Sequence, residues 1–278
     1  MIFLEKSEKM KYSFITDSLS LLYSTKEKFH HKPPDKKMLK QLMKGLERVI
    51  FPEYYLGNFN KMRLEREVRG VYKKLFKLLR SLDFFKSVER AKNTSMLFIN
   101  ELAYIKTVIS SDVDAIFASD PACESYDEII YAYPTLLAIF SYRIAHVLSS
   151  LGVPLIPKMI SERAHSLTGI DISPGAEIGS HFFIDHGTGV VIGKTAVIGD
   201  YVKIYQGVTL GAFSLKKGRL LAHVKRHPTI EDNVTIYAGA TILGGDTVIG
   251  RDSIIGGASF ITRSVPEGSK ISGCTQLS

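Results

Sequence analysis

From residue 172 to about residue 265, a large apolar residue recurs at every sixth position. The repeat is interrupted twice, between Ile184 and Ile192 and between Leu210 and Ile230. A fixed six-residue period indicates a parallel β-helix, in which each hexad supplies one short strand and one turn. An ordinary sheet would alternate with a period of two. The three series are Ile172, Ile178, Ile184; Ile192, Ile198, Ile204, Leu210; and Ile230, Ile236, Ile242, Val248, Ile254, Phe260.

Each interruption exceeds a whole number of hexads by two residues, and we expect both to be loops pushed outward from the coil. The first follows Ile184, and the second protrudes over 213–225. Loops on a rigid scaffold are where binding and catalytic residues concentrate. The sequence therefore predicts that the chemistry of this protein is located near these two loops.

The N-terminal half has apolar residues at helical spacing instead. Over 35–50, Leu39, Leu42 and Leu46 share one face, and Asp35 is placed to cap the first turn. The predicted helices are 35–50, 61–82, 95–118, a helix that starts at Asp120 and Pro121, 134–152 and 155–167.

The pair Asp120-Pro121 combines a favoured N-cap with a favoured first helical residue, which predicts a helix start. Gly169 marks the change from helices to the coil. The sequence thus predicts an α+β protein with an α-helical domain over 1–168 and a β-helix over 169–278. We expect the helical domain to serve packing and oligomerisation.

The formal net charge of +8 comes from an excess of basic residues in the first 110 positions. These residues are interleaved with acidic ones at helical spacing, which favours solvated helix faces over a nucleic-acid surface. The longest apolar stretch, 129–151, is interrupted by Pro134, Arg143 and His146, so we expect no membrane span. The first residues lack the apolar run of a secretory signal, and two cysteines cannot build a disulfide framework. We expect a cytoplasmic protein without nucleic-acid or membrane partners.

Five short strings stand out: DPAC at 120–123, GIDI at 169–172, IDHGTG at 184–189, QGVTLG at 206–211 and RHPTI at 226–230. Together they resemble the serine acetyltransferase family over roughly residues 90–268. DHGTG preceded by GIDI and followed by RHP is far more specific than the hexapeptide repeat, which many acyltransferases share. The resemblance implies a left-handed β-helix with three hexads in each coil, which makes about four coils here.

His186 lies in the first interruption, so we expect it to project from the coil. A histidine titrates near neutral pH and can take a proton from an alcohol. Asp171 lies fifteen residues earlier, nearly one coil, and stacking could bring its carboxylate beside the imidazole to hold the tautomer and stabilise the imidazolium. The alternative for a histidine next to an aspartate in a turn is a local cap. Asp171 and His186 are the predicted catalytic pair.

Asp120, Asp185, Arg226 and His227 supply both signs of charge, which recognition of a zwitterionic amino acid requires. The resemblance implies that Asp120 and Asp185 hold the amino end of serine. It also implies that the pair Arg226 and His227 holds the carboxylate. By bare chemistry, Asp120 is more often only an N-cap.

Small residues at 207–211 and 238–240 would let an extended thioester cofactor lie against the backbone. The resemblance implies that the pantetheine arm of acetyl-CoA binds there, with Gly211, Ala212, Ala238 and Gly239 as contacts. The alternative is simple corner geometry of the coil. The loop at 213–225 is longer than the compact loop usual in the family, and its residues Lys216, Lys217 and Arg219 could meet phosphates of the cofactor or be solvated.

The implied reaction is direct transfer of an acetyl group from acetyl-CoA to the L-serine hydroxyl, giving O-acetylserine for cysteine synthesis. His186 would remove the hydroxyl proton, and backbone donors would stabilise the oxyanion. An acetyl-cysteine intermediate is not expected, because Cys123 has no adjacent base and Cys274 is in the tail. No metal is expected.

The resemblance implies a homotrimer or a dimer of trimers. The chain ends in Gln276-Leu277-Ser278 rather than in the isoleucine that docks into cysteine synthase in many relatives. This departure puts a complex with that partner in doubt.

Three alternatives stay open. One is an acetyltransferase for homoserine or another small hydroxylated acceptor, since one methylene is a modest discriminator. Another is a metalloenzyme like the γ-class carbonic anhydrases, because His181 and His186 have a compatible spacing, although they occupy different hexad positions. The last is a catalytically inactive scaffold, which would not need Asp171, His186 and His227 together.

Overall fold

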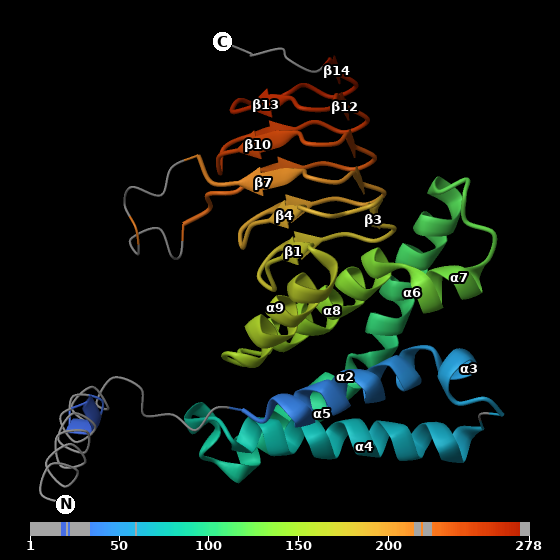
Figure 1. Ribbon diagram of the computed structural model, residues 1–278, viewed down its shortest axis with the longest axis vertical. Helices are drawn as coiled ribbons and strands as arrows, with labels where there is room; N and C mark the ends of the chain where they lie inside the picture. Colours follow the sequence, from blue (N-terminus) through green and yellow to red (C-terminus); the bar gives the residue numbers. More distant parts are fainter. Residues whose placement is uncertain are drawn as a thin grey trace, which may run out of the picture.

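The computed structural model describes residues 18–20, 22, 34–58, 60–213, 218 and 224–272. Figure 1 shows helices at one end of the molecule and a stack of short-stranded coils at the other. The predicted α+β fold, a helical region followed by a parallel β-helix, is confirmed. Within the described residues, no helix has both the length and the apolar character needed to cross a membrane. Residues 276–278, on which the prediction about a cysteine synthase complex rests, lie outside the described residues.

The helical region contains, in chain order, α2 (Lys36–Ile50), α3 (Pro52–Tyr55), α4 (Lys61–Arg80), η2 (Asp83–Phe85), α5 (Val88–Asn100), α6 (Leu102–Ser119), α7 (Tyr126–Ala132), α8 (Pro134–Ser150) and α9 (Ile156–Thr168). Asp35 caps α2 as predicted, because its side chain accepts hydrogen bonds from the N–H groups of Lys37 and Met38. Gly169, with φ +72°, ends α9 in the left-handed conformation and directs the chain into the coils.

Two helix predictions were wrong. The predicted helix over 95–118 is two helices, α5 and α6, which are separated at Glu101. The predicted helix start at Asp120-Pro121 does not exist, because Asp120 is instead the C-cap of α6. The next helix, α7, begins only at Tyr126, where the Ser125 hydroxyl accepts the N–H of Glu128 and provides a better cap.

The β-helix consists of three parallel sheets whose short strands follow one another around the coil. Sheet A contains β1 (Asp171–Ile172), β4 (Val191–Ile192), β7 (Thr209–Gly211), β10 (Thr241–Leu243) and β13 (Phe260–Ile261). Sheet B contains β2 (Glu177–Ile178), β5 (Val197–Ile198), β8 (Thr229–Ile230) and β11 (Val248–Ile249). Sheet C contains β3 (Phe183–Ile184), β6 (Lys203–Ile204), β9 (Thr235–Ile236), β12 (Ile254–Ile255) and β14 (Lys270–Ile271). We name the turns between sheets the A–B, B–C and C–A corners.

The inward residues stack in register. In sheet A, Ile172 pairs with Ile192, which pairs with Leu210, and all three are buried. Leu210 in turn pairs with the buried Ile242. Each added rung therefore removes another aliphatic side chain from water, which is why the coils are stable only as a stack.

The inward column shifts by one residue after Ile242, because β10 is three residues long and Ile242 is followed seven residues later by Ile249. The buried residues after the shift are Ile249, Ile255 and Ile261, and not the predicted Val248, Ile254 and Phe260. Phe260 instead faces outward and is 49% exposed. Sheets A and C are five strands deep, slightly more than the expected four coils, because the coil continues through β14.

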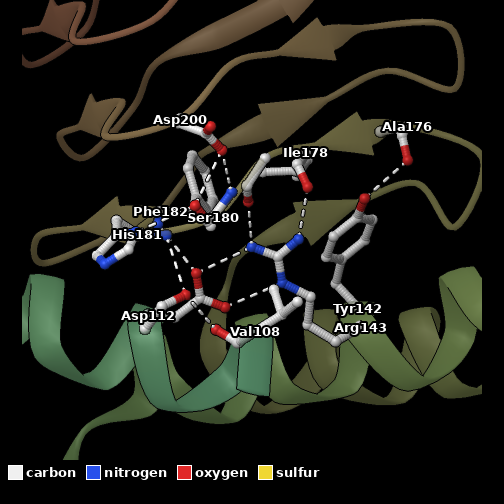
Figure 2. Close-up of polar contacts among 12 residues, drawn as sticks. Val108, Asp112, Tyr142, Arg143, Ala176, Ile178, Ser180, His181, Phe182 and Asp200 are labelled. Carbon is white, nitrogen blue, oxygen red and sulfur yellow. Dashed lines mark hydrogen bonds and ion pairs between the residues drawn. The ribbon is translucent and has the colours of Figure 1, made fainter. Parts of the chain in front are cut away.

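A buried ion pair joins the helical region to the first coil (Figure 2). Asp112 of α6 accepts two hydrogen bonds of 2.9 Å from the Arg143 guanidinium of α8. Arg143 also donates to the carbonyls of Ile178 and Gly179, each at 2.6 Å. The Asp112 carboxylate accepts the Phe182 N–H at 2.9 Å, and its side chain is completely buried.

Burial raises the pKa of Asp112, and the Arg143 guanidinium opposes this rise. The two charges neutralise each other, and the guanidinium also binds two carbonyl groups of the coil. Separating the helices from the coil would leave these carbonyl groups without their hydrogen-bond donor. The hydroxyl of Tyr142, next to Arg143, donates to Ala176 O at 2.7 Å and adds a second contact (Figure 2). These contacts fix α6 on the first coil and thereby fix the position of its C-terminal end.

Candidate active site

The first predicted loop is a tight turn at the C–A corner between β3 and β4. The Gly187 N–H donates to Asp185 O at 2.5 Å, which leaves His186 at the tip with φ +54°. Non-glycine residues rarely adopt this conformation, and three-residue turns of this kind are strained. The His186 side chain is 71% exposed, and its Nδ1 lies 3.7 Å from Asp185 Oδ1. The turn therefore holds the imidazole outside the coil.

Asp120 reaches the same corner from the C-terminal end of α6. Its Oδ2 accepts the Tyr133 hydroxyl at 2.6 Å, and its Oδ1 accepts the Ala122 N–H at 2.8 Å. These two hydrogen bonds, with a smaller contribution from nearby His186, hold the pKa of Asp120 below its usual value. Asp120 is therefore kept ionised at neutral pH.

The ring of Tyr205 lies near both carboxylates of this corner. Burial raises the pKa of the Tyr205 hydroxyl, and the negative charges of Asp185 and Asp120 add to this effect. Tyr205 stacks on Tyr237 of the next coil with ring centroids 5.1 Å apart. The C–A corner thus combines Asp120, Asp185 and His186 beside the stacked rings of two tyrosines.

Asp171, the predicted partner of His186, lies on β1 and pairs with Val191. Its N–H donates to Val190 O at 2.9 Å. Asp171 and His186, which are both among the described residues, form no hydrogen bond or ion pair with each other. The imidazole forms its ion-pair contact with Asp185 instead. The catalytic pair predicted from the sequence is therefore not assembled in the single chain.

Arg226 and His227 lie at the A–B corner, where the second loop returns to the coil before β8. The backbone N–H groups of both residues donate to Thr195 Oγ1, at 3.0 and 3.2 Å. The His227 ring packs over Gly193, where a Cβ would occupy the same space as the ring. Lys225 Nζ donates to Thr195 O at 2.8 Å and to His227 O at 2.7 Å. The base of the second loop is thus bound to the turn of the coil below it.

Burial lowers the pKa of His227 to about 4, and the charges of Arg226 and Lys225 add to this shift. His227 is therefore neutral at pH 7, and Arg226 supplies the positive charge of the pair. Thr195, Lys225 and Tyr133 were not identified from the sequence, because each acts through a contact that only the fold creates.

The predicted substrate residues are divided between two corners. Asp120, Asp185 and His186 gather at the C–A corner, which precedes β4 in the coil. Arg226 and His227 lie against the turn that follows β4. The predicted cofactor residues divide in the same way: Ala238 and Gly239 lie at the C–A corner, and Gly211 and Ala212 at the end of β7.

The small residues of the C–A corner are required by its geometry. Gly207 has φ +71° and Gly239 has φ +72°, a conformation that favours glycine. The Gly239 N–H donates to Gln206 O at 2.9 Å, so the two turns stack directly. Lys216, Lys217 and Arg219 of the second loop lie outside the described residues.

The two histidines of the metal alternative do not converge. His181 lies at the B–C corner, where its ring stacks on Tyr201 at 4.1 Å and its Nδ1 is 3.0 Å from Ser180 Oγ. His186 lies at the C–A corner. Among the described residues, no group of three or more histidine, cysteine, aspartate or glutamate side chains is arranged to hold a metal ion.

The chain matches no family model, but it is similar to several known proteins. It is 48% identical over 187 residues to the plasmid serine acetyltransferase of Synechococcus elongatus, a match that covers 66% of this chain and 58% of that protein. It is 49% identical over 166 residues to the serine acetyltransferase of Bacillus licheniformis, which covers 60% of this chain and 74% of that protein. The match thus spans less than two thirds of the first relative and about three quarters of the second.

The fold is also similar to that of serine acetyltransferases, over nearly the whole chain. The crystal structure of serine acetyltransferase isoform 3 from Entamoeba histolytica, in complex with cysteine, superposes with a TM-score of 0.76 and 30% sequence identity. The superposition covers 96% of this chain and 94% of that structure. Sequence and fold agree, and the chain belongs to the serine acetyltransferase family.

Proposed function

We propose that this chain transfers the acetyl group of acetyl-CoA to the hydroxyl of L-serine. The observation that supports this most directly is the pair of carboxylates, Asp120 and Asp185, beside an exposed histidine at one corner of the coil. Two carboxylates suit an ammonium group, and a neighbouring imidazole suits removal of a proton from a hydroxyl. Similarity to serine acetyltransferases in sequence and fold supports the same substrate.

In the proposed reaction, the His186 imidazole accepts the proton of the serine hydroxyl while the oxygen attacks the thioester carbonyl. The new C–O bond produces a tetrahedral oxyanion, which backbone N–H groups would stabilise. Collapse breaks the C–S bond, and the leaving thiolate of CoA takes the proton from the imidazolium. Asp171 would stabilise that imidazolium once the substrate has turned the His186 ring, since catalytic hydrogen bonds often form fully only with substrate bound.

We further propose that Asp120 and Asp185 bind the serine ammonium and that Arg226 and His227 bind its carboxylate. Because these two groups are at different corners of one chain, a complete site would combine the C–A corner of one protomer with the A–B corner of another. A homotrimer of side-by-side coils would meet this requirement. It is supported by the outward apolar residues of sheet A, Val191 and Phe260, which are 39% and 49% exposed.

The pantetheine arm of acetyl-CoA would lie between the protomers, along Gly211 and Ala212 of one and Ala238 and Gly239 of the other. Joining of two trimers through the helical region and a cytoplasmic location both stay predictions.

Acetyl transfer is tested by measuring CoA release from acetyl-CoA with L-serine, with L-homoserine and without acceptor. We expect serine-dependent release that falls by a factor of about 10²–10⁴ in His186→Ala. His165→Ala, which removes an exposed histidine of α9, is the matched control and should retain activity. Release with homoserine alone would change the substrate, and no release with either acceptor from folded protein would disprove the proposed function.

The shared site is tested by complementation between two inactive variants. His186→Ala and Arg226→Ala chains are purified separately, then unfolded and refolded together. If each site uses one corner from each of two protomers, a mixed trimer contains one site with both corners intact, and activity returns. If each site lies within one chain, every mixed trimer stays inactive, which would contradict the proposal.

A further inference from the structure

Thr195 is the centre of the contacts that hold the A–B half of the site. It lies in the turn between β4 and β5, one coil below Arg226 and His227. Its Oγ1 accepts the N–H groups of Arg226 and His227, and it lies 2.8 Å from His227 Nδ1. The Thr195 N–H donates to the same Nδ1 at 3.1 Å. One residue therefore contacts both the backbone and the ring of His227.

These contacts determine which nitrogen of His227 has the proton. A backbone N–H can only donate, so His227 Nδ1 must accept and cannot itself be protonated. The Thr195 hydroxyl has one hydrogen and two lone pairs. Its lone pairs accept the two backbone N–H groups, so its hydrogen is directed to Nδ1, and every hydrogen-bonding capacity of the hydroxyl is used. In neutral imidazole the proton must then be on Nε2.

We propose that Thr195 is a positioning residue that holds His227 as the Nε2–H tautomer, so that the serine carboxylate meets a neutral N–H donor beside the Arg226 cation. This inference rests on the proposed function, in which Arg226 and His227 bind that carboxylate. The depressed pKa of His227, about 4, agrees with a ring that stays neutral.

The arrangement suits recognition of a carboxylate next to a cation. A protonated His227 would be a third positive charge beside Arg226 and Lys225, and its burial would be costly. A neutral ring with its proton on Nδ1 would present a lone pair from Nε2 and repel a carboxylate. Only the Nε2–H tautomer both tolerates burial and donates to the substrate.

The tautomer is read directly by solid-state NMR of protein with ¹⁵N-labelled histidine. The lines of such spectra do not broaden with the size of an oligomer. The His227 signals are assigned by their absence in His227→Gln. We expect the Nδ1 chemical shift of a non-protonated nitrogen and the Nε2 shift of a protonated one. A protonated Nδ1 in the wild type would overturn the proposal, whether or not the protein acetylates serine.

Kinetics then test the role of the hydroxyl. Thr195→Val retains the branched shape but removes the hydroxyl, and we expect the KM for serine to rise about tenfold with kcat changed much less. Thr195→Ser should restore most of the affinity. Thr247→Val is the matched control, because Thr247 lies at the same corner two coils away and its hydroxyl donates to Leu243 O.

The two assays separate the possible failures. If the wild type does not acetylate serine, the proposed function fails, and the NMR spectrum still decides the tautomer. If the wild type is active but Thr195→Val retains both its KM for serine and its His227 spectrum, Thr195 is only structural and the inference is wrong.

Discussion

The C–A half of the candidate site is assembled from two parts of the chain, whereas the A–B half is assembled by one coil lying on another. At the C–A corner, Asp120 comes from the end of α6 and meets His186 of the first coil. At the A–B corner, Arg226 and His227 are bound to Thr195, which belongs to the same β-helix. The first half therefore depends on how the helical region docks, and the second does not.

The energetics of the two halves differ accordingly. The docking of α6 relies on the ion pair of Asp112 and Arg143, which is buried and makes three further hydrogen bonds to backbone groups of the first coil. Removing one member of such a pair leaves a buried charge without its partner. The contacts of Thr195 are hydrogen bonds between neutral groups, each of which contributes about 1 kcal/mol. Damage to the first half should therefore be severe, and damage to the second graded.

The largest effect is expected for Asp112→Ala. This change leaves the Arg143 guanidinium buried without a carboxylate, and we expect it to reduce the free energy of unfolding by about 3–5 kcal/mol. Urea unfolding followed by circular dichroism measures the loss. Asp114→Ala is the control on the same helix, because Asp114 is exposed and accepts the Tyr126 hydroxyl.

The Asp112→Ala protein should also separate the two halves of the site under conditions in which it stays folded. Asp120 should lose its position while the His227 tautomer, read by NMR, stays as in the wild type. A changed His227 spectrum would mean that the A–B half also depends on the docking of α6, and the distinction between the halves would be lost.

A smaller effect is expected for Arg226→Gln, which removes the cation proposed to bind the serine carboxylate. A charge-assisted hydrogen bond contributes about 1.5–3 kcal/mol, so the KM for serine should rise by a factor of roughly 10–100 while the KM for acetyl-CoA changes little. Arg251→Gln is the control, since Arg251 is an exposed arginine of the same β-helix. An unchanged KM for serine would remove Arg226 from the substrate site.

The periodicity of the coil predicted the fold because each rung must bury one aliphatic residue, and Ile172, Ile192 and Leu210 do so in register. The same pattern missed the shift after Ile242. There the buried residue Ile249 directly follows Val248, so both phases of the repeat look equally apolar in the sequence.

The site was predictable only where a motif identified it. The strings around His186 and Arg226 are specific, and they locate the two loops of the coil. The helix start predicted at Asp120 was wrong because Asp120 ends α6, and Ser125 caps the next helix instead. The contact that defines the role of Asp120, with the Tyr133 hydroxyl thirteen residues away, has no local signal. Thr195 has no signal in the sequence, since its contacts with His227 span 32 residues and exist only when the coils stack.

The smallest effect is expected for Tyr133→Phe, which removes the hydroxyl that donates to Asp120 Oδ2. This hydrogen bond is the main reason that the pKa of Asp120 is depressed, so the pKa should rise toward its usual value in the variant. Asp120 binds an ammonium only when ionised. As the pH falls, the variant should therefore lose affinity for serine at a higher pH than the wild type does.

At neutral pH, where Asp120 is ionised in both proteins, the KM of Tyr133→Phe should rise only about threefold, from looser positioning of the carboxylate. The measurement is kcat/KM for serine as a function of pH, with Tyr131→Phe as the control, because the Tyr131 hydroxyl donates to Tyr54 O and not to Asp120. His227, with a pKa of about 4, titrates in the same acid range, but it is unchanged in Tyr133→Phe, so its titration contributes equally to both profiles and the difference between them reports Asp120. Superimposable profiles for Tyr133→Phe and wild type would show that serine binding does not depend on the ionisation of Asp120, and the ammonium site would then have to rest on Asp185 alone.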